Sequence, residues 1–409
     1  MKPTGLLDSV LPGLVAMTVF GTYPAWAFEL NDQISVAGIL APAGQCQDVS
    51  ARLPSGGYGT PLLEDDESSD GWVATADPAS GADDSMDAFG NECRGGLPFQ
   101  LEASFHPDDN NEFFFKFGFA AGNGLNEVSP WALAPWAADL EEEVKDINGR
   151  GRSYLLTAWY EHRVVFQNET AMSTTVGIID STDYLDGNAY ANDEYSQFMN
   201  EALVNSATYD LPSYDVGAAS ELGYRQWTLT GLGMNIGENE DGNNYNFWGA
   251  EIGYHPETPM GAGNYRLTVS GTSAAFLDPS GKDKEGRLGF GLSFDQEFGP
   301  ILGAFLRCGW QNEAAAVDYR SLYSGGFNVS GKGWNREEDN VGIGYAYLDG
   351  GNEDIDYSRV FEAYYRAGLN DYAAVTADIQ YMKDAVEEVD PSQDNPAGWI
   401  FGLRVTAEF

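Results

Sequence analysis

The sequence predicts an all-β protein, a closed antiparallel transmembrane β-barrel of about 16 strands with long extracellular loops and inward-folded loops. Three observations predict it. The C-terminal stretch Gly398–Phe409 alternates apolar and polar residues, strand-like runs recur from Ile34 onward, and short turns alternate with long ones. Closure into a barrel follows because lipid cannot satisfy the hydrogen-bonding groups of an open sheet edge.

The C-terminal stretch has one apolar and one polar face. Trp399, Phe401 and Leu403 share one parity, and Gly402 and Arg404 share the other. Its length matches the roughly 9–11 residues of a tilted transmembrane strand. A strand that ends on an aromatic residue resembles the β-signal read by the barrel assembly machinery, which we therefore expect as a partner. The alternative is the last strand of a soluble sandwich.

The N-terminus has the layout of a signal peptide. Lys2 precedes the apolar run Val10–Phe20, and Ala25-Trp26-Ala27 supplies small residues before a cut at position 28. We therefore expect residues 1–27 to be removed and residues 28–409 to form one barrel domain. No apolar run reaches the roughly 18 residues of a spanning helix.

The net charge and the cysteines limit which partners and which cellular compartment we expect for the protein. A formal net charge of −42 argues against nucleic acid, whose phosphates it would repel. Much of it lies in the long acidic loop 50–95, interpreted as a solvated loop. Cys46 and Cys93 flank that loop and are a candidate disulfide in an oxidising periplasm; the alternative is two free thiols. Cys308 lies inside a strand and is interpreted as a small hydrophobe.

The first half of the chain combines five predicted strands with long insertions. The strands are expected at 34–49, 97–105, 111–122, 153–166 and 171–179. The run 111–122 carries Phe113, Phe115, Phe117 and Phe119 on one face. In the run 153–166, Tyr154, Leu156, Ala158 and Tyr160 are expected to face outward, and Thr157, Trp159, Glu161 and Arg163 inward. The insertion 123–151 is expected to be partly helical, and the insertion 180–215 to hold a helix at 191–204.

The second half repeats the pattern with shorter loops. Strands are expected at 216–223, 227–236, 246–255, 263–274, 287–298, 301–311, 323–334, 340–348, 358–368, 372–382 and 398–409. Outward aromatic residues recur near strand ends, as expected for the aromatic girdles of such barrels: Tyr160, Tyr254, Tyr345, Tyr347, Tyr365 and Tyr381.

The residues at the inward-facing positions of the strands predict a hydrated pathway. These positions carry small residues and charges of both signs, namely Glu102, Lys116, Glu161, Arg163, Glu251, Arg266, Asp295, Arg307, Lys332, Glu362, Arg366, Asp378 and Arg404. Mixed donors and acceptors near an aromatic such as Trp159 suit a neutral polyol. The alternative is that these residues only pair with one another and keep the lumen wet.

No motif for catalysis, metal or cofactor binding is present. The run 326–332 (GFNVSGK) nearly matches a phosphate-binding loop, but Gly333 follows the lysine and no strand-to-helix context exists. The three histidines are scattered, without metal-ligand spacing. We therefore expect no enzyme activity, no metal and no cofactor.

The amino-acid sequence resembles those of the carbohydrate-selective porins of Gram-negative outer membranes, the OprB-like family. The matching stretches are FKFGFAAGNGLN (115–126), LAPWAADLEEEVKDINGR (133–150), YLLTAWYEH (154–162), DYLDGNAYANDEYSQFMNEALVN (183–205), GENEDGNNYNFWGAEIGYH (237–255), GFGLSFDQEFG (289–299), VGIGYAYLDGG (341–351) and GWIFGLRVTAEF (398–409). The resemblance implies a 16-stranded barrel that passes sugars by diffusion.

The resemblance also implies a constriction made by the insertions 123–151 and 180–215, with Trp131, Trp136, Asp183 and Tyr184 as candidates. The cysteine pair and the acidic loop depart from the family pattern. The expected function is passive diffusion of mono- or small oligosaccharides across the outer membrane, with its lipid and lipopolysaccharide as surroundings and a homotrimer as a further expectation. The alternatives are a general, cation-preferring porin, a non-conducting envelope barrel whose loops bind a partner or ions, and a secreted carbohydrate-active enzyme.

Overall fold

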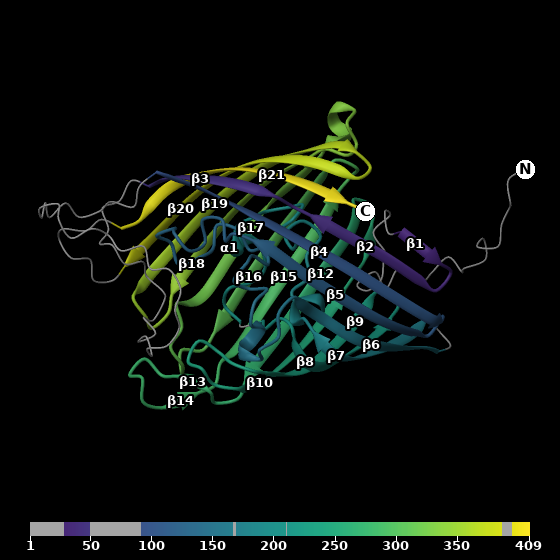
Figure 1. Ribbon diagram of the computed structural model, residues 1–409, viewed down its shortest axis with the longest axis horizontal. Helices are drawn as coiled ribbons and strands as arrows, with labels where there is room; N and C mark the ends of the chain where they lie inside the picture. The colour runs from purple at the N-terminus through teal and green to yellow at the C-terminus, as the bar shows by residue number, and fades with distance from the viewer. Residues whose placement is uncertain (1–27, 50–90, 167–168, 210, 387–394) are drawn as a thin grey trace, which may run out of the picture.

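The structure, a computed structural model, describes residues 28–49, 91–166, 169–209, 211–386 and 395–409. It is a closed antiparallel barrel of 16 strands, which confirms the predicted fold class (Figure 1). The predicted signal peptide 1–27 and most of the acidic loop 50–95 lie outside the described residues and stay predictions.

The barrel strands follow one another around the wall in chain order. They are β2 (Ile34–Leu40) continued by β3 (Ala43–Val49), β4 (Glu92–Asp108), β5 (Asn111–Ala121), β6 (Leu155–Phe166), β7 (Thr170–Ile179), β8 (Asp215–Tyr224), β9 (Trp227–Ile236), β10 (Tyr245–Tyr254), β12 (Gly261–Thr272), β15 (Leu288–Phe298), β16 (Leu302–Gln311), β17 (Tyr319–Ser330), β18 (Asn340–Gly350), β19 (Ile355–Asn370), β20 (Ala373–Val386) and β21 (Ala397–Glu408).

The last strand closes the barrel against the first. β21 pairs with β3 over Gly398–Arg404 and with β2 at Ile39 and Leu40. The predicted strand 34–49 is two segments, because Pro42 has no N–H to donate to the ladder. The carbonyl of Pro42 still accepts from the N–H of Val405 at 2.9 Å, so the wall remains continuous across the break.

The two faces of the strands separate as the alternation predicts. In β21 the side chains of Trp399, Phe401 and Leu403 are 41%, 53% and 56% exposed on the outer surface, whereas Arg404 is fully buried inside. The outward row of β5 is likewise exposed at Phe113 and Phe115. The outer surface is therefore the apolar one, as lipid requires.

One predicted orientation is wrong. Leu156 was expected to face outward, but it is fully buried and packs with Val144 and Ile147 inside the barrel. The pairing of β5 with β6 shifts register between Lys116 and Phe117. Such a bulge adds one residue to a strand and turns its side chain to the other face.

The long insertions contain almost no helix. The predicted helix 191–204 is wrong except for α1 (Glu201–Val204), and the insertion 123–151 holds only the 3₁₀ turn η1 (Ile147–Gly149). A second 3₁₀ turn, η2 (Ser181–Asp183), follows β7. No helix in the described part of the chain is long and apolar enough to cross a membrane.

The remaining elements are short additions at the two ends of the barrel. They are β1 (Phe28–Asn31) beside β2, β11 (Glu257–Thr258) beside β12, the hairpin β13 (Phe276–Leu277) with β14 (Lys284–Glu285), and the 3₁₀ turn η3 (Gly331–Trp334). Lys332 lies in η3, beyond the end of β17. The prediction that Lys332 faces the lumen from a strand is therefore wrong.

The long insertions fold into the barrel and pack on its inner wall (Figure 1). Phe198 and Leu203 of the segment 180–214 join a buried cluster with Phe305 and Tyr364 of the wall. The rings of Phe198 and Tyr364 meet edge to face, with centroids 5.1 Å apart. The lumen is therefore partly filled by an apolar core, and only the rest of it is open.

Candidate functional site

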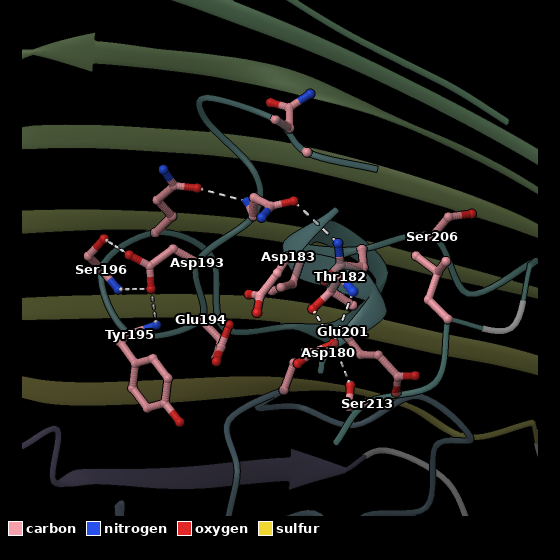
Figure 2. Close-up of a pocket in the computed structure, with 18 of the residues that line it drawn as sticks. Asp180, Thr182, Asp183, Asp193, Glu194, Tyr195, Ser196, Glu201, Ser206 and Ser213 are labelled. Carbon is pink, nitrogen blue, oxygen red and sulfur yellow. Dashed lines mark hydrogen bonds between the residues drawn. The ribbon is translucent and has the colours of Figure 1, made fainter. Parts of the chain in front are cut away.

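A polar cavity of about 2070 Å³ runs between the folded-in segment 180–214 and the barrel wall. Figure 2 shows its acidic and hydroxyl side chains on that segment, among them Asp180, Asp183, Glu194 and Tyr195. Residues near both ends of the barrel line it as well, Glu240 beside the long loops and Asp371 beside the short turns. The cavity is therefore a passage along the barrel axis and not a closed pocket in one loop.

The lining of the passage is strongly acidic. Four basic side chains line it, Lys116, Arg266, Arg287 and Arg366. They are outnumbered by fifteen carboxylates, namely Glu102, Asp139, Asp180, Asp183, Asp193, Glu194, Glu201, Glu240, Asp241, Glu257, Asp318, Glu338, Glu353, Asp371 and Glu408. A passage with this charge attracts cations and repels anions.

Lys116 of β5 is one of the cations that line the passage. It is the register partner of Glu102 across β4 and β5, and it interacts electrostatically with Asp139, Asp180 and Asp183 of the insertions. No ion pair joins Lys116 directly to any described carboxylate. Its ammonium can therefore donate hydrogen bonds to a solute without first breaking a salt bridge.

Two carboxyl groups of the folded-in segment titrate near neutral pH. Burial raises the pKa of Asp183 to about 7, and the nearby Asp180 adds to the rise while Lys116 opposes it. Burial also raises the pKa of Glu194 to about 8, with repulsion from Asp193 as the next cause. Asp183 reaches the water of the cavity although the barrel encloses it. Both groups therefore change charge within a range of pH that an experiment can cover.

Four hydrogen-bonded side chains near these carboxyl groups also line the passage, and the sequence reasoning did not single them out. Asp139 accepts from Tyr214 Oη at 2.7 Å and from Gln100 Nε2 at 2.8 Å. Gln100 Nε2 also donates to Tyr195 Oη at 3.0 Å. Asp139 and Tyr195 do lie in the stretches 133–150 and 183–205 that resemble the OprB-like family. Nothing in these stretches distinguishes the two residues from their neighbours.

The folded-in segment is held by an ion pair with the wall. Arg307 Nε donates to Asp186 Oδ1 at 2.9 Å, and both side chains are fully buried. The same Asp186 accepts from Tyr209 Oη at 2.7 Å and from the N–H of Ser206 at 2.8 Å. Arg307 also donates to the carbonyl of Ala191 at 2.9 Å. The Arg307–Asp186 pair thus joins the barrel wall to both halves of the segment 180–214, the half before α1 and the half after it.

Two further wall residues hold the backbone of the segment. Glu362 accepts from the N–H groups of Met199 at 2.6 Å and Asn200 at 2.9 Å. Arg404 donates to the carbonyls of Glu194 at 2.7 Å and Gln197 at 2.9 Å. These bonds use backbone groups that a helix would have needed, which is why the predicted helix does not form.

The structure thus corrects the prediction that Arg307, Glu362 and Arg404 line the pathway. The side chains of Arg307 and Arg404 and the Glu362 carboxylate lie under the segment and do not reach the cavity. They determine the shape of the passage indirectly, by placing the segment. Of the predicted wall residues, Glu102, Lys116, Arg266 and Arg366 do line it, and so does Asp183 of the segment.

The predicted aromatic residues are packed and do not line the passage. Trp131 and Tyr184 belong to buried clusters, and Trp136 is fully buried with its indole Nε1 donating to the carbonyl of Glu194 at 3.1 Å. Trp159 stacks on Phe114, with ring centroids 4.9 Å apart. Trp131, Trp136 and Tyr184 thus lie in buried clusters and not on the cavity surface, and a role of the partly buried Trp159 toward a solute stays a prediction.

The last predicted pathway residues lie toward the end of the barrel that carries the short turns. Glu161 accepts from Thr175 Oγ1 at 3.3 Å, and Arg163 donates its backbone N–H to the carbonyl of Asn110 at 2.8 Å. Neither is among the residues that line the cavity. Arg366 lines it at the same end, 3.7 Å from Glu408 Oε1.

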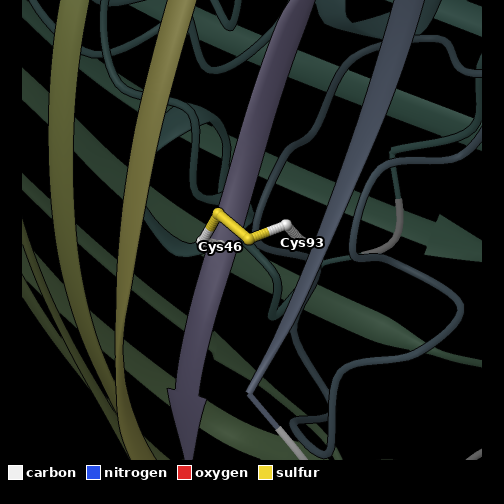
Figure 3. The surroundings of a disulfide bond; sticks show 2 residues. All are labelled: Cys46 and Cys93. Carbon is white, nitrogen blue, oxygen red and sulfur yellow. A yellow bond between two sulfur atoms is a disulfide. The ribbon is translucent and has the colours of Figure 1, made fainter.

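Cys46 and Cys93 are joined by a disulfide, with the sulfur atoms 2.02 Å apart (Figure 3). The two residues are register partners on β3 and β4, and both side chains face the outer surface. The bond spans a sequence separation of 47 residues. It therefore joins the two strands at the base of the predicted acidic loop and takes no part in the passage.

Comparison with known proteins identifies the family. The model of the carbohydrate-selective porins, the OprB family, matches residues 137–409. The chain belongs to the OprB family. An uncharacterised protein of Aquifex aeolicus is 31% identical over 302 residues, which cover 73% of this chain and 84% of that protein. The resemblance inferred from the sequence is thereby confirmed.

Solved structures agree on the fold. The barrel is similar to OprB of Pseudomonas putida at high pH, with a TM-score of 0.65 and 15% identity over 92% of this chain and 94% of that one. It is also similar to the outer membrane channel DcaP of Acinetobacter baumannii, with a TM-score of 0.50 and 10% identity over 93% and 99% of the two chains.

The OprB-family protein is a porin of the outer membrane and a passive carbohydrate channel, as predicted. Barrels of this class have short periplasmic turns and longer extracellular loops. The end with the insertions 122–154 and 180–214 is therefore the extracellular end.

Proposed function

We propose that the passage beside the segment 180–214 is the selectivity constriction and that it admits mono- or small oligosaccharides. The observation that carries the proposal is the position of that segment inside the barrel. Buried contacts to Arg307, Glu362 and Arg404 fix it there, beside the polar passage. A fixed narrow zone discriminates by size and by hydrogen bonding, whereas an open barrel would pass any small solute.

The chemistry of the lining suits a neutral polyol. Lys116 and Glu102 offer N–H donors and acceptors from the wall, and Asp183, Tyr195 and Tyr214 offer acceptors and hydroxyl groups from the segment 180–214. A sugar exchanges its hydration for such bonds one at a time as it moves. Binding of this kind is weak enough to release the solute at the far side. No bond of the solute breaks, so the proposed mechanism needs no catalytic residue and no cofactor.

Single-channel conductance in a planar bilayer tests the proposal. The protein is reconstituted, and glucose, maltose and a neutral non-sugar of similar size are titrated in turn. We expect concentration-dependent block by the sugars and none by the non-sugar. Steady conductance in all three titrations would contradict a sugar pathway, and a folded barrel without conductance would favour the non-conducting envelope protein.

A second candidate is a general porin that prefers cations, and the excess of carboxylates in the passage favours it. Both candidates predict a preference for cations. They differ in whether a sugar blocks the conductance. The reversal potential across a KCl gradient measures the cation preference, and sugar block under the same conditions measures solute binding. Strong cation preference without sugar block would establish the general porin.

We further propose that the barrel assembly machinery reads β21 and that the barrel forms a homotrimer. The C-terminal ring supports the first proposal, because Phe409 lies over Gly38 of the closing strand and 6.4 Å from the ring of Phe99. Exposed stacked rings such as Phe105 and Phe113 offer a contact for the second. Removal of Phe409 is expected to lower the yield of assembled barrel, and cross-linking in membranes is expected to give a trimer band.

A further inference from the structure

Two basic side chains face each other on the outer surface of the barrel. Arg359 of β19 and Lys383 of β20 are direct register partners. Both have the outward parity of their strands, since the alternate residues Ser358 and Glu362 of β19 and Asp384 of β20 are buried inside. Arg359 is exposed and Lys383 is half-buried. Two positive charges therefore meet on the face that contacts lipid.

This arrangement is unfavourable unless an anion is present. Like charges directly opposite on a sheet destabilise it. Within the described residues, neither Arg359 nor Lys383 forms an ion pair with a carboxylate. Of the described carboxylates near them, Asp349 is paired with Arg320 at 2.7 Å, and the exposed Asp356, which acts with Arg359 on Tyr347, forms no ion pair with either cation. The chain has 21 basic and 63 acidic residues, so two adjacent cations that no carboxylate of the described residues pairs with are an uncommon arrangement.

Aromatic rings hold the two cations in place. The Arg359 guanidinium lies over the ring of Tyr357 at 4.7 Å and over Tyr347 at 5.9 Å, and Lys383 Nζ lies 5.9 Å from the centroid of Tyr357. Tyr347 and Tyr357 stack on each other, with centroids 6.0 Å apart. Cation–π contacts orient the two heads but do not neutralise their charge.

The pair lies at the extracellular boundary of the lipid-facing surface. The next outward row toward the membrane centre is aromatic and consists of Tyr345, Phe361, Tyr381 and Trp399, which are successive register partners on β18 to β21. On the other side, β19 begins at Ile355 and β20 ends at Val386, where the extracellular loops start. Aromatic girdles mark the membrane interface, so the cations stand at the level of the outer-leaflet headgroups.

We propose that Arg359 and Lys383 bind a phosphate group of a phosphorylated glycolipid of the outer leaflet. Arginine binds phosphate through two parallel N–H donors, and lysine adds a point charge from the neighbouring strand. The acyl chains of the same lipid would lie along the aromatic row below. Basic residues at a membrane boundary bind anionic headgroups by this chemistry. The site is on the outer wall and is independent of the passage inside the barrel.

Titration of the detergent-solubilised barrel with bisphosphorylated lipid A tests the proposal, with native mass spectrometry as the readout. The double variant Arg359→Gln, Lys383→Gln is expected to weaken binding roughly tenfold or more. The variant Lys282→Gln, Lys284→Gln removes the same charge from the exposed extracellular hairpin region and is expected to bind as the parent does. Heat-modifiable gel migration checks that each barrel is folded.

Two further titrations separate the sources of the phosphate. Dephosphorylated lipid A is expected to bind the parent as weakly as it binds the double variant. Inorganic phosphate is expected not to compete at the concentrations at which the lipid saturates. Equal binding of the bisphosphorylated lipid to parent and double variant would overturn the proposal, and so would full competition by inorganic phosphate, because the site would then take free anions.

Discussion

Arg307 Nε lies 2.9 Å from Asp186 Oδ1, and water reaches neither side chain. Arg307 belongs to the barrel wall and Asp186 to the segment that narrows the lumen. Breaking a buried pair by removing one partner leaves an uncompensated charge in the interior. The pair therefore couples the stability of the barrel to the width of its passage.

Arg307→Met is expected to lower the free energy of unfolding by about 3–5 kcal/mol, because Asp186 would be left buried without its cation. The segment is expected to leave the wall, which raises single-channel conductance and weakens sugar block. Urea unfolding in lipid vesicles and bilayer recordings measure the two effects. Arg320→Met is the control, since its exposed pair with Asp349 is worth at most about 1 kcal/mol. Unchanged conductance in Arg307→Met would show that the segment does not depend on this pair.

Lys116→Gln is expected to increase the preference for cations, because Glu102, Asp139 and Asp183 would then act without the cation between them. The reversal potential in a KCl gradient measures the change. Arg225→Gln removes the same charge in a turn on the surface, where the side chain is 65% exposed, and is expected to leave the potential unchanged. If sugar block is lost in Lys116→Gln and not in Arg225→Gln, the Lys116 ammonium also binds the solute.

Cation preference is expected to rise as the pH is raised from 6 to 9. Below pH 7 the raised pKa values, about 7 for Asp183 and about 8 for Glu194, keep both carboxyl groups mostly neutral. Deprotonation above these values adds two negative charges to the passage. Reversal potentials at several pH values measure the rise.

Asp183→Asn, Glu194→Gln is expected to flatten this dependence, while Glu257→Gln at the periplasmic rim is expected to keep it. A pH-dependent rise of the same size in the Asp183, Glu194 double variant would assign the titration to other groups.

Replacement of both Cys46 and Cys93 by serine is expected to lower the free energy of unfolding by about 2–4 kcal/mol, because the cross-link no longer limits the unfolded chain. Conductance and sugar block are expected to stay the same, since the bond lies on the outer surface at the base of the acidic loop. Non-reducing gels and urea unfolding make the measurement. A changed conductance would show that this strand pair also shapes the passage.

The strands and their faces could be predicted because they depend on local alternation. The rows of Phe113 and of Trp399 identify the lipid side without any knowledge of the partner strands. Leu156 shows the limit of this reasoning. The bulge between β5 and β6 adds one residue, and only the pairing of the two strands reveals it.

The sequence by itself determined the barrel, its lipid face and the family, because the pleat gives every strand a period of two and lipid accepts only a closed sheet. The tertiary structure alone decided which inward charges meet the solute. Lys116 reaches the passage, whereas Arg307 and Arg404 are covered by a segment more than a hundred residues away in the chain. An inward side chain meets either water or a folded-in loop, and long-range packing, which leaves no periodic trace in the sequence, selects between them.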